Sequence, residues 1–355
     1  VRYWHPARFI RNLLPARFAV GGRRQLVARL SLTLKSTVLR LTVQQKLQRG
    51  DALTKIAFLF PGQGAQTVGM ARELCDELPV ASDLFKRAAD LLGYDLADIC
   101  FNGPAEKLNS TVISQPALYV SSMAVLEKLK LDKPDIYQNC EGAAGLSLGE
   151  YTALAFAGGM SFEEGLRLVQ RRGQAMQEAA DETPSSMVSV LGLDPEQTEK
   201  VCDEARVEGE VLQIANLLCK GNIAVSGGLA SCERVPAVAE AAGAMKSVPL
   251  AVAGAFHTPI MESAVGKISE ALSQVEIQPT RLPVYSNVDA RPHTAPAEFK
   301  EQLVKQVCAP VLWQDSIERM LEDGFDEFYE VGVGRVLRSL MKRIHRKTKC
   351  YGVLD

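Results

Sequence analysis

A serine inside a glycine-rich motif is the residue of this sequence best suited to covalent chemistry. The segment from Gly145 to Gly149 reads Gly-Leu-Ser-Leu-Gly. This pattern is typical of a nucleophile elbow, in which the serine lies on a sharp turn between a strand and a helix. A base that removes the hydroxyl proton allows such a serine to form an ester with an acyl group. The motif predicts acyl transfer through Ser147, and the alternative is a tight turn that happens to contain a serine.

The base has to be sought among four histidines. Three of them lie in unpromising places: His5 in the basic N-terminal segment, His293 in a proline-containing loop and His345 in the basic C-terminal segment. His257 follows an apolar, glycine-containing run at 252–256. We therefore expect His257 to be the base that activates the serine. The alternative is a buried histidine with a purely structural role.

Three further residues could stabilise charge during acyl transfer. Gln63 follows an apolar strand and Leu148 follows the serine, so their backbone N–H groups could form an oxyanion hole. For the loop at Gln63 the alternative is a simple tight turn. Arg172 lies on a predicted helix beyond the motif and could hold a substrate carboxylate through two parallel hydrogen bonds. The alternative for Arg172 is an ordinary exposed arginine.

Strands and helices alternate over 51–183 and 254–355, which we interpret as one large α/β acyltransferase domain. Such alternation predicts a mainly parallel sheet covered by helices, similar to that of hydrolases. The segment 184–253 follows the order β-α-β-β-α-β and predicts an inserted ferredoxin-like (βαββαβ) subdomain. We expect the site in the cleft between the two. Among the expected helices, one covers 70–93 and one begins at Pro116.

The first 50 residues differ in charge from the rest of the chain. They contain eleven Lys and Arg and no Asp or Glu, which leaves 29 basic and 42 acidic residues after them, a net charge of −13. An Arg-rich segment without acids is typical of a mitochondrial transit peptide, so residues 1–50 are expected to be a disordered transit segment. The alternative, an arm that binds nucleic acid, usually has Lys-rich clusters and interleaved aromatic residues.

Several other classes of protein are not indicated. Apolar runs of the 18–20 residues that a membrane helix needs are absent from the sequence. The eight cysteines form no Cys-x-x-Cys pair, so we expect free thiols and no metal site. We also expect no nucleic-acid partner.

Over about 54–345 the sequence resembles the malonyl-CoA:acyl-carrier-protein transacylase family in its mitochondrial form. The order and spacing of seven short segments carry this resemblance. They are Phe60-Pro61-Gly62-Gln63-Gly64, Gln115-Pro116-Ala117, Gly145–Glu150, Arg172-Gly173 with Met176, Gly254-Ala255-Phe256-His257, Tyr285-Ser286-Asn287-Val288 and Glu330-Val331-Gly332.

The resemblance implies a role for each candidate residue. Ser147 would be acylated by the malonyl group, with His257 as its base. The backbone N–H groups of Gln63 and Leu148 would form the oxyanion hole, and Arg172 would bind the malonyl carboxylate and so select malonyl over acetyl.

Three other positions bear on the comparison with this family. Gln306 matches a residue whose main-chain carbonyl orients the histidine. Leu146 and Val333 depart from the family, because many members have His and Pro there. Neither departure changes a proposed catalytic atom.

The implied reaction is a two-step transfer of malonyl from malonyl-CoA to the phosphopantetheine thiol of acyl carrier protein, for mitochondrial fatty acid synthesis in the matrix. It needs no metal and no bound cofactor, because the CoA thioester is a substrate and the carrier protein brings the phosphopantetheine. We expect a monomer. The alternatives are an α/β-hydrolase-type thioesterase or lipase and a non-catalytic module that binds carrier protein. A basic cluster from Arg338 to Lys349 is either a docking surface for carrier protein or a solvated helix face.

Overall fold

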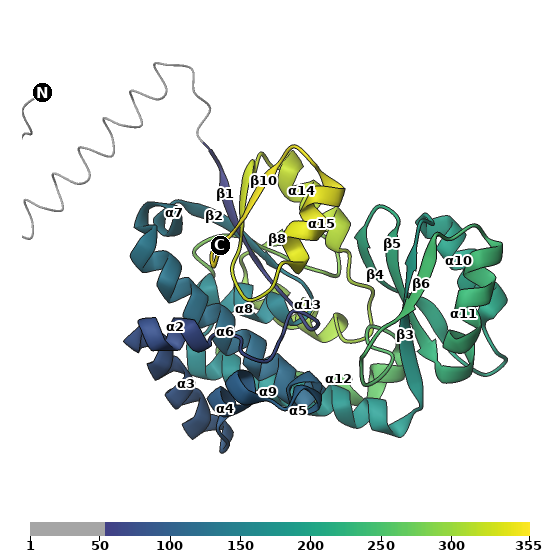
Figure 1. Ribbon diagram of the computed structural model, residues 1–355, viewed down its shortest axis with the longest axis horizontal. Helices are drawn as coiled ribbons and strands as arrows, with labels where there is room; N and C mark the ends of the chain where they lie inside the picture. Colours follow the sequence, from purple (N-terminus) through teal and green to yellow (C-terminus); the bar gives the residue numbers. More distant parts are fainter. Residues whose placement is uncertain (1–53) are drawn as a thin grey trace, which may run out of the picture. The chain divides into compact units, whose positions relative to one another are not determined.

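The computed structural model describes residues 54–355, and residues 55–355 form one compact unit (Figure 1). The predicted transit segment, residues 1–50, lies outside the described residues. None of the described helices combines the length and the apolar character needed to cross a membrane.

A six-stranded sheet organises the larger part of the chain. Its strand order is β10-β9-β1-β2-β7-β8, and every neighbouring pair is parallel except β7 with β8. The strands are β1 (Ile56–Phe60), β2 (Cys140–Gly145), β7 (Val284–Tyr285), β8 (Pro292–His293), β9 (Glu327–Glu330) and β10 (Lys349–Gly352). The prediction of a mainly parallel sheet is confirmed.

Both faces of this sheet are covered, which explains why β1 is apolar throughout. Phe58 and Phe60 enter one core, while Ala57 and Leu59 enter the core on the opposite face, as the pleat requires. The helices on the first face are α2 (Arg72–Glu77), α3 (Pro79–Leu92), α4 (Leu96–Asn102), α5 (Ala105–Asn109), α6 (Thr111–Asp132), α7 (Pro134–Gln138), α8 (Leu148–Phe156), α9 (Phe162–Glu182), α12 (Glu262–Ser273) and α13 (Pro296–Lys305). On the second face lie α14 (Trp313–Glu322) and α15 (Val336–Ile344), drawn side by side in Figure 1.

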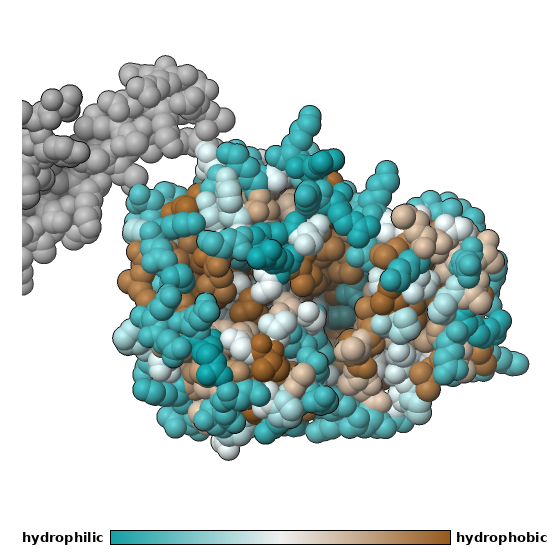
Figure 2. Space-filling model, in the orientation of Figure 1, coloured by the Kyte–Doolittle hydropathy of each residue, from teal (hydrophilic) through white to brown (hydrophobic). Residues whose placement is uncertain are grey.

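A separate antiparallel sheet has the strand order β4-β5-β3-β6. Its elements are β3 (Ser185–Leu191), α10 (Pro195–Ala205), β4 (Leu212–Cys219), β5 (Asn222–Gly228), α11 (Leu229–Ala241) and β6 (Lys246–Pro249). This is the expected ferredoxin-like order, with α10 and α11 packed on one face around Val188 and Val225. The boundaries at 184 and 253 remain a prediction. Figure 2 shows the surface hollowed between this part and the part built on the parallel sheet.

Two helix predictions were wrong in their limits. The expected helix over 70–93 is two helices, because Leu78 is extended (φ −122°, ψ 107°) and Pro79 starts α3 at its first position. The helix expected to begin at Pro116 starts at Thr111 instead. Proline inside a helix removes one backbone hydrogen bond. Since α6 is buried along most of its length, packing outweighs that loss.

Candidate active site

The elbow motif forms the predicted turn between β2 and α8. Ser147 has φ 50° and ψ −103°, a backbone conformation that non-glycine residues rarely adopt. The flanking glycines allow it. A Cβ on Gly145 would lie 1.9 Å from the carbonyl carbon of Gly149, and one on Gly149 would lie 2.1 Å from the oxygen of Phe60. Larger residues at either position would push the helix away from the sheet.

His257 lies directly against the serine. Its Nε2 is 2.9 Å from Ser147 Oγ, and its Nδ1 is 2.8 Å from the main-chain oxygen of Gln306. When Nδ1–H donates to that carbonyl, Nε2 is left as the acceptor facing the hydroxyl. The main-chain oxygen of His257 accepts from Gln213 Nε2 of β4 at 3.3 Å. The site therefore lies where the antiparallel sheet meets the larger part of the chain.

Burial keeps the His257 ring neutral. The side chain is 3% exposed, and burial followed by the charge of Arg172 lowers its pKa to about 4, although the Gln306 carbonyl acts in the opposite direction. A neutral imidazole can accept the serine proton at physiological pH.

This lowered pKa of His257 makes stability depend on pH. Below pH 6.5 the unfolded chain takes up a proton that the folded chain resists until about pH 4. The folded state therefore keeps its full stability with respect to His257 above pH 6.5 and loses part of it as the pH falls towards 4. We expect the wild type to lose about 2 kcal/mol more free energy of unfolding than His257→Gln between pH 7.5 and pH 5. Urea unfolding of both proteins at the two pH values measures this, and equal losses would contradict it.

Arg172 is buried beside the nucleophile, so the alternative of an exposed arginine is wrong. Its side chain lies on α9 and is 2% exposed. Nη2 donates to Ser147 Oγ and to Gln306 Oε1, both at 2.9 Å, and Nη1 donates to Gln115 Oε1 at 3.0 Å. The guanidinium also lies 5.3 Å from the ring centre of Tyr151. This places a positive charge directly against the serine hydroxyl.

Two backbone N–H groups beside the elbow have no acceptor among the described residues. Leu148 is the first residue of α8, and Gln63 follows Gly62 in the loop after β1. A Cβ on Gly62 would lie 2.2 Å from the oxygen of Leu146, so this loop packs against the elbow. Within residues 54–355 neither the N–H of Gln63 nor that of Leu148 has an acceptor. Both can donate to a developing oxyanion.

Asn287 was not among the predicted site residues. Its Oδ1 accepts from the N–H of Ser147 at 2.6 Å, and its Nδ2 donates to the oxygen of Gly145 at 2.8 Å. Its own N–H donates to Glu150 Oε2 at 3.0 Å. Asn287 therefore clamps the strained elbow. The segment Tyr285–Val288 carries part of the family resemblance, but its contact with the elbow exists only in the folded chain.

The Gln306 side chain and Glu150 were also missed. Gln306 Nε2 donates to the main-chain oxygen of Ser147 at 3.1 Å and to Glu150 Oε2 at 2.8 Å. Glu150 is 1% exposed, and this burial raises the pKa of its carboxyl to about 7. The family resemblance implied a role only for the main-chain carbonyl of Gln306.

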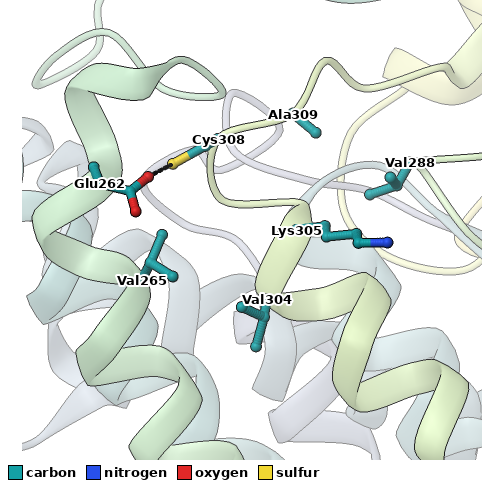
Figure 3. A pocket seen from close by; sticks show the side chains of 7 residues that line it. All are labelled: Glu262, Val265, Val288, Val304, Lys305, Cys308 and Ala309. Atoms are coloured by element: carbon teal, nitrogen blue, oxygen red, sulfur yellow. Dashed lines mark hydrogen bonds between the residues drawn. The ribbon is translucent and has the colours of Figure 1, made fainter.

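A pocket of about 360 Å³ lies near these residues but is lined by none of the six predicted site residues (Figure 3). Its lining is Glu262, Val265, Val288, Val304, Lys305, Cys308 and Ala309. Figure 3 shows the Cys308 thiol directed at Glu262, whose Oε2 it approaches to 3.5 Å. Burial and this carboxylate raise the pKa of Cys308 to about 12, so the thiol stays protonated and is a poor nucleophile.

An elbow serine, a neutral histidine and two free N–H donors on this fold define a serine acyltransferase. Comparison with known proteins agrees, because residues 57–350 match the family model of the acyl transferase domain.

Curated relatives and solved structures narrow the family. The chain is 40% identical over 305 residues to the malonyl CoA-acyl carrier protein transacylase of Bacillus subtilis, covering 85% of this chain and 94% of the relative. It is 38% identical over 309 residues to the mitochondrial enzyme of Homo sapiens, covering 84% and 79%. The transacylase structure from Coxiella burnetii matches with a TM-score of 0.81 and 34% identity over 84% of this chain and 94% of that chain. The chain belongs to the malonyl-CoA–acyl carrier protein transacylase family, which confirms the predicted resemblance.

Proposed function

We propose that this protein transfers malonyl from malonyl-CoA to the phosphopantetheine thiol of acyl carrier protein through a malonyl ester on Ser147. The observation that carries the proposal is that Ser147 Oγ lies 2.9 Å from both His257 Nε2 and Arg172 Nη2. A base and a cation for a carboxylate thus meet at one hydroxyl. In support, one matching structure is a malonyl-transacylase in complex with a type II PKS acyl-carrier protein, with a TM-score of 0.79, 35% identity and coverage of 84% of this chain and 95% of that chain.

In the first step the serine is acylated. The hydroxyl proton of Ser147 moves to His257 Nε2 as the oxygen attacks the thioester carbonyl. The N–H groups of Gln63 and Leu148 donate to the resulting oxyanion, while Arg172 holds the malonyl carboxylate. When the tetrahedral intermediate collapses, the C–S bond breaks and the CoA sulfur takes the proton from His257.

The second step runs the same chemistry in reverse with a new thiol. The phosphopantetheine thiol gives its proton to the histidine and attacks the ester carbonyl, and the Ser147 oxygen leaves with that proton. Water must be excluded during this interval, because hydrolysis would otherwise compete. The burial of His257 and Arg172 supports that requirement. As proposed, the reaction uses no metal and no bound cofactor.

The test is covalent labelling. Brief exposure to malonyl-CoA without carrier protein should add one malonyl group to the intact mass, and peptide mapping should place it on Ser147. Addition of carrier protein should then remove it. Steady hydrolysis of malonyl-CoA without an acceptor would favour the thioesterase alternative instead, and absence of any adduct would favour the non-catalytic module.

The proposed setting is the mitochondrial matrix, with the protein as a monomer. The composition of residues 1–50 and the mitochondrial relatives from human and mouse support the mitochondrial setting.

A basic surface near α15 is the proposed docking site for carrier protein. It consists of Lys220, Lys342, Arg343, Arg346 and Lys347, all exposed. Arg343 Nη2 lies 3.3 Å from the oxygen of Gly221, which brings the β4–β5 turn beside the helix. Arg338 does not contribute freely, because it pairs with Glu330 and Asp355. Acyl carrier proteins are generally acidic, so opposite charge would guide docking.

Charge reversal tests this surface. We expect Lys342→Glu/Arg343→Glu to raise the KM for carrier protein at least severalfold, while the KM for malonyl-CoA stays close to that of the wild type. Lys86→Glu/Lys133→Glu makes the same charge change at exposed positions elsewhere and serves as the matched control. Steady-state kinetics with each substrate varied decides the matter. An equal effect of both double variants would leave only a general charge effect.

A further inference from the structure

Arg172 is a buried cation without a carboxylate against it. Its acceptors are the neutral oxygens of Gln115, Gln306 and Ser147, and its Nε has no partner in the part of the chain that the structure describes. Among residues 54–355, no carboxylate oxygen lies within 4.0 Å of its guanidinium nitrogens. Burying a charge without a partner of opposite sign is costly, and direct pairing with a nearby carboxylate would lower that cost. Some contact must therefore keep such a carboxylate away from Arg172.

A candidate anion is close by. Glu150 on α8 is 1% exposed, and its Oε1 has no hydrogen-bond partner from Thr54 to the C-terminal residue. Its Oε2 accepts from the N–H of Asn287 at 3.0 Å and from Gln306 Nε2 at 2.8 Å. The Glu150 oxygen and the guanidinium Nε that lack partners among the described residues show that neither group has its full set of contacts.

One amide lies between the two charges. Gln306 Oε1 accepts from Arg172 Nη2 at 2.9 Å, while Gln306 Nε2 donates to Glu150 Oε2 at 2.8 Å. The two ends of a primary amide suit these neighbours, since its oxygen only accepts and its NH2 only donates. Burial raises the pKa of Glu150 to about 7, and the hydrogen bonds from Asn287 and Gln306 oppose this more than the charge of Arg172 does, as expected for side chains kept apart.

We propose that the Gln306 side chain determines specificity as a spacer: it keeps Glu150 from pairing with Arg172, so that the guanidinium stays available to the carboxylate of the acyl group. This inference rests on the proposed function. Direct pairing with Glu150 would occupy the donors that the substrate carboxylate needs. The main-chain carbonyl of Gln306 holds His257 independently of this role.

Exchange of the amide and the carboxylate tests the spacer. Gln306→Glu/Glu150→Gln keeps both functional groups and the total charge, but it places a carboxylate directly against Arg172. We expect the ratio of kcat/KM for malonyl-CoA to that for acetyl-CoA to fall at least tenfold. Glu150→Gln alone is the matched control. Its malonyl-to-acetyl ratio should not fall, because no carboxylate remains at position 150 to pair with the guanidinium.

A second pair of variants covers the case in which the exchange prevents folding. Gln306→Met keeps the side-chain length and the main-chain carbonyl but removes the four side-chain hydrogen bonds, which join Gln306 to Arg172, Glu150, Asn287 and the main-chain oxygen of Ser147. We expect the malonyl-to-acetyl ratio to fall in Gln306→Met and to recover to within about threefold of wild type in Gln306→Met/Glu150→Gln, where no carboxylate remains to pair. A purely structural role predicts the opposite, because a second change in a damaged network would add to the loss.

The outcomes separate this inference from the proposed function. An unchanged ratio in the exchange variant, or a ratio that stays low in Gln306→Met/Glu150→Gln, would overturn the spacer. Intact-mass analysis of the wild type after brief exposure to malonyl-CoA reports on the proposed function alone. A malonylated wild type combined with either adverse ratio rejects only the spacer, whereas an unlabelled wild type rejects the proposed function.

Discussion

Ser147→Ala should form no covalent malonyl-enzyme and should lose transfer activity by about 10⁴- to 10⁶-fold. Removing the nucleophile of a serine enzyme abolishes the ester route and leaves only the small rate enhancement that binding and the oxyanion donors supply. The substitution deletes one oxygen. The hydrogen bond that holds the elbow comes from the backbone N–H of residue 147 to Asn287 Oδ1, so it does not need the hydroxyl and the turn should persist. Intact mass after exposure to malonyl-CoA and the rate of transfer to carrier protein measure the two effects.

The half-buried thiol of Cys308 provides the control for this experiment. It is a potential nucleophile in a neighbouring pocket, but its pKa of about 12 keeps it protonated. Cys308→Ala should therefore gain malonyl as the wild type does. A Ser147→Ala protein that still gains malonyl, with the label on a cysteine, would show that the elbow serine is not the acylated residue.

Arg172→Ala should lose the preference for malonyl over acetyl by roughly 10- to 100-fold. A hydrogen bond to a charged group is worth about 1.5–3 kcal/mol, and each 1.4 kcal/mol is tenfold in affinity. The acetyl group has no carboxylate and gains nothing from the guanidinium. The measurement is the ratio of kcat/KM for malonyl-CoA and acetyl-CoA, together with urea unfolding, because the amides of Gln115 and Gln306 lose a partner. We expect the selectivity to change more than the stability.

A matched arginine lies on the same helix. Arg167 is exposed on α9, so Arg167→Ala removes the same group from the solvated face. The ratio of kcat/KM for malonyl-CoA to that for acetyl-CoA in Arg167→Ala should equal that of the wild type. If Arg172→Ala also keeps the wild-type ratio, the guanidinium does not bind the acyl carboxylate, and selectivity must come from another part of the site.

Several parts of the fold were predictable because their signals are local. The apolar run at β1, the glycines around Ser147 and the β-α-β-β-α-β order each appear within a short stretch of sequence. Other elements depend on distant partners. The strand Lys349–Gly352 has only four residues and forms by pairing with β9, and Pro116 is carried inside α6 because that helix is buried. Local propensity could not reveal either.

By itself, the sequence determined which side chains are candidates for nucleophile, base and carboxylate clamp, because the residue types and the glycine pattern around Ser147 do not depend on the fold. Only the tertiary structure decided how these groups are charged and held. Arg172 is buried rather than exposed, and Gln306 joins it to Glu150 across 134 and 156 residues of chain. Such contacts set the electrostatics of the site, since burial and the distance between charges are properties of the folded chain and not of any segment.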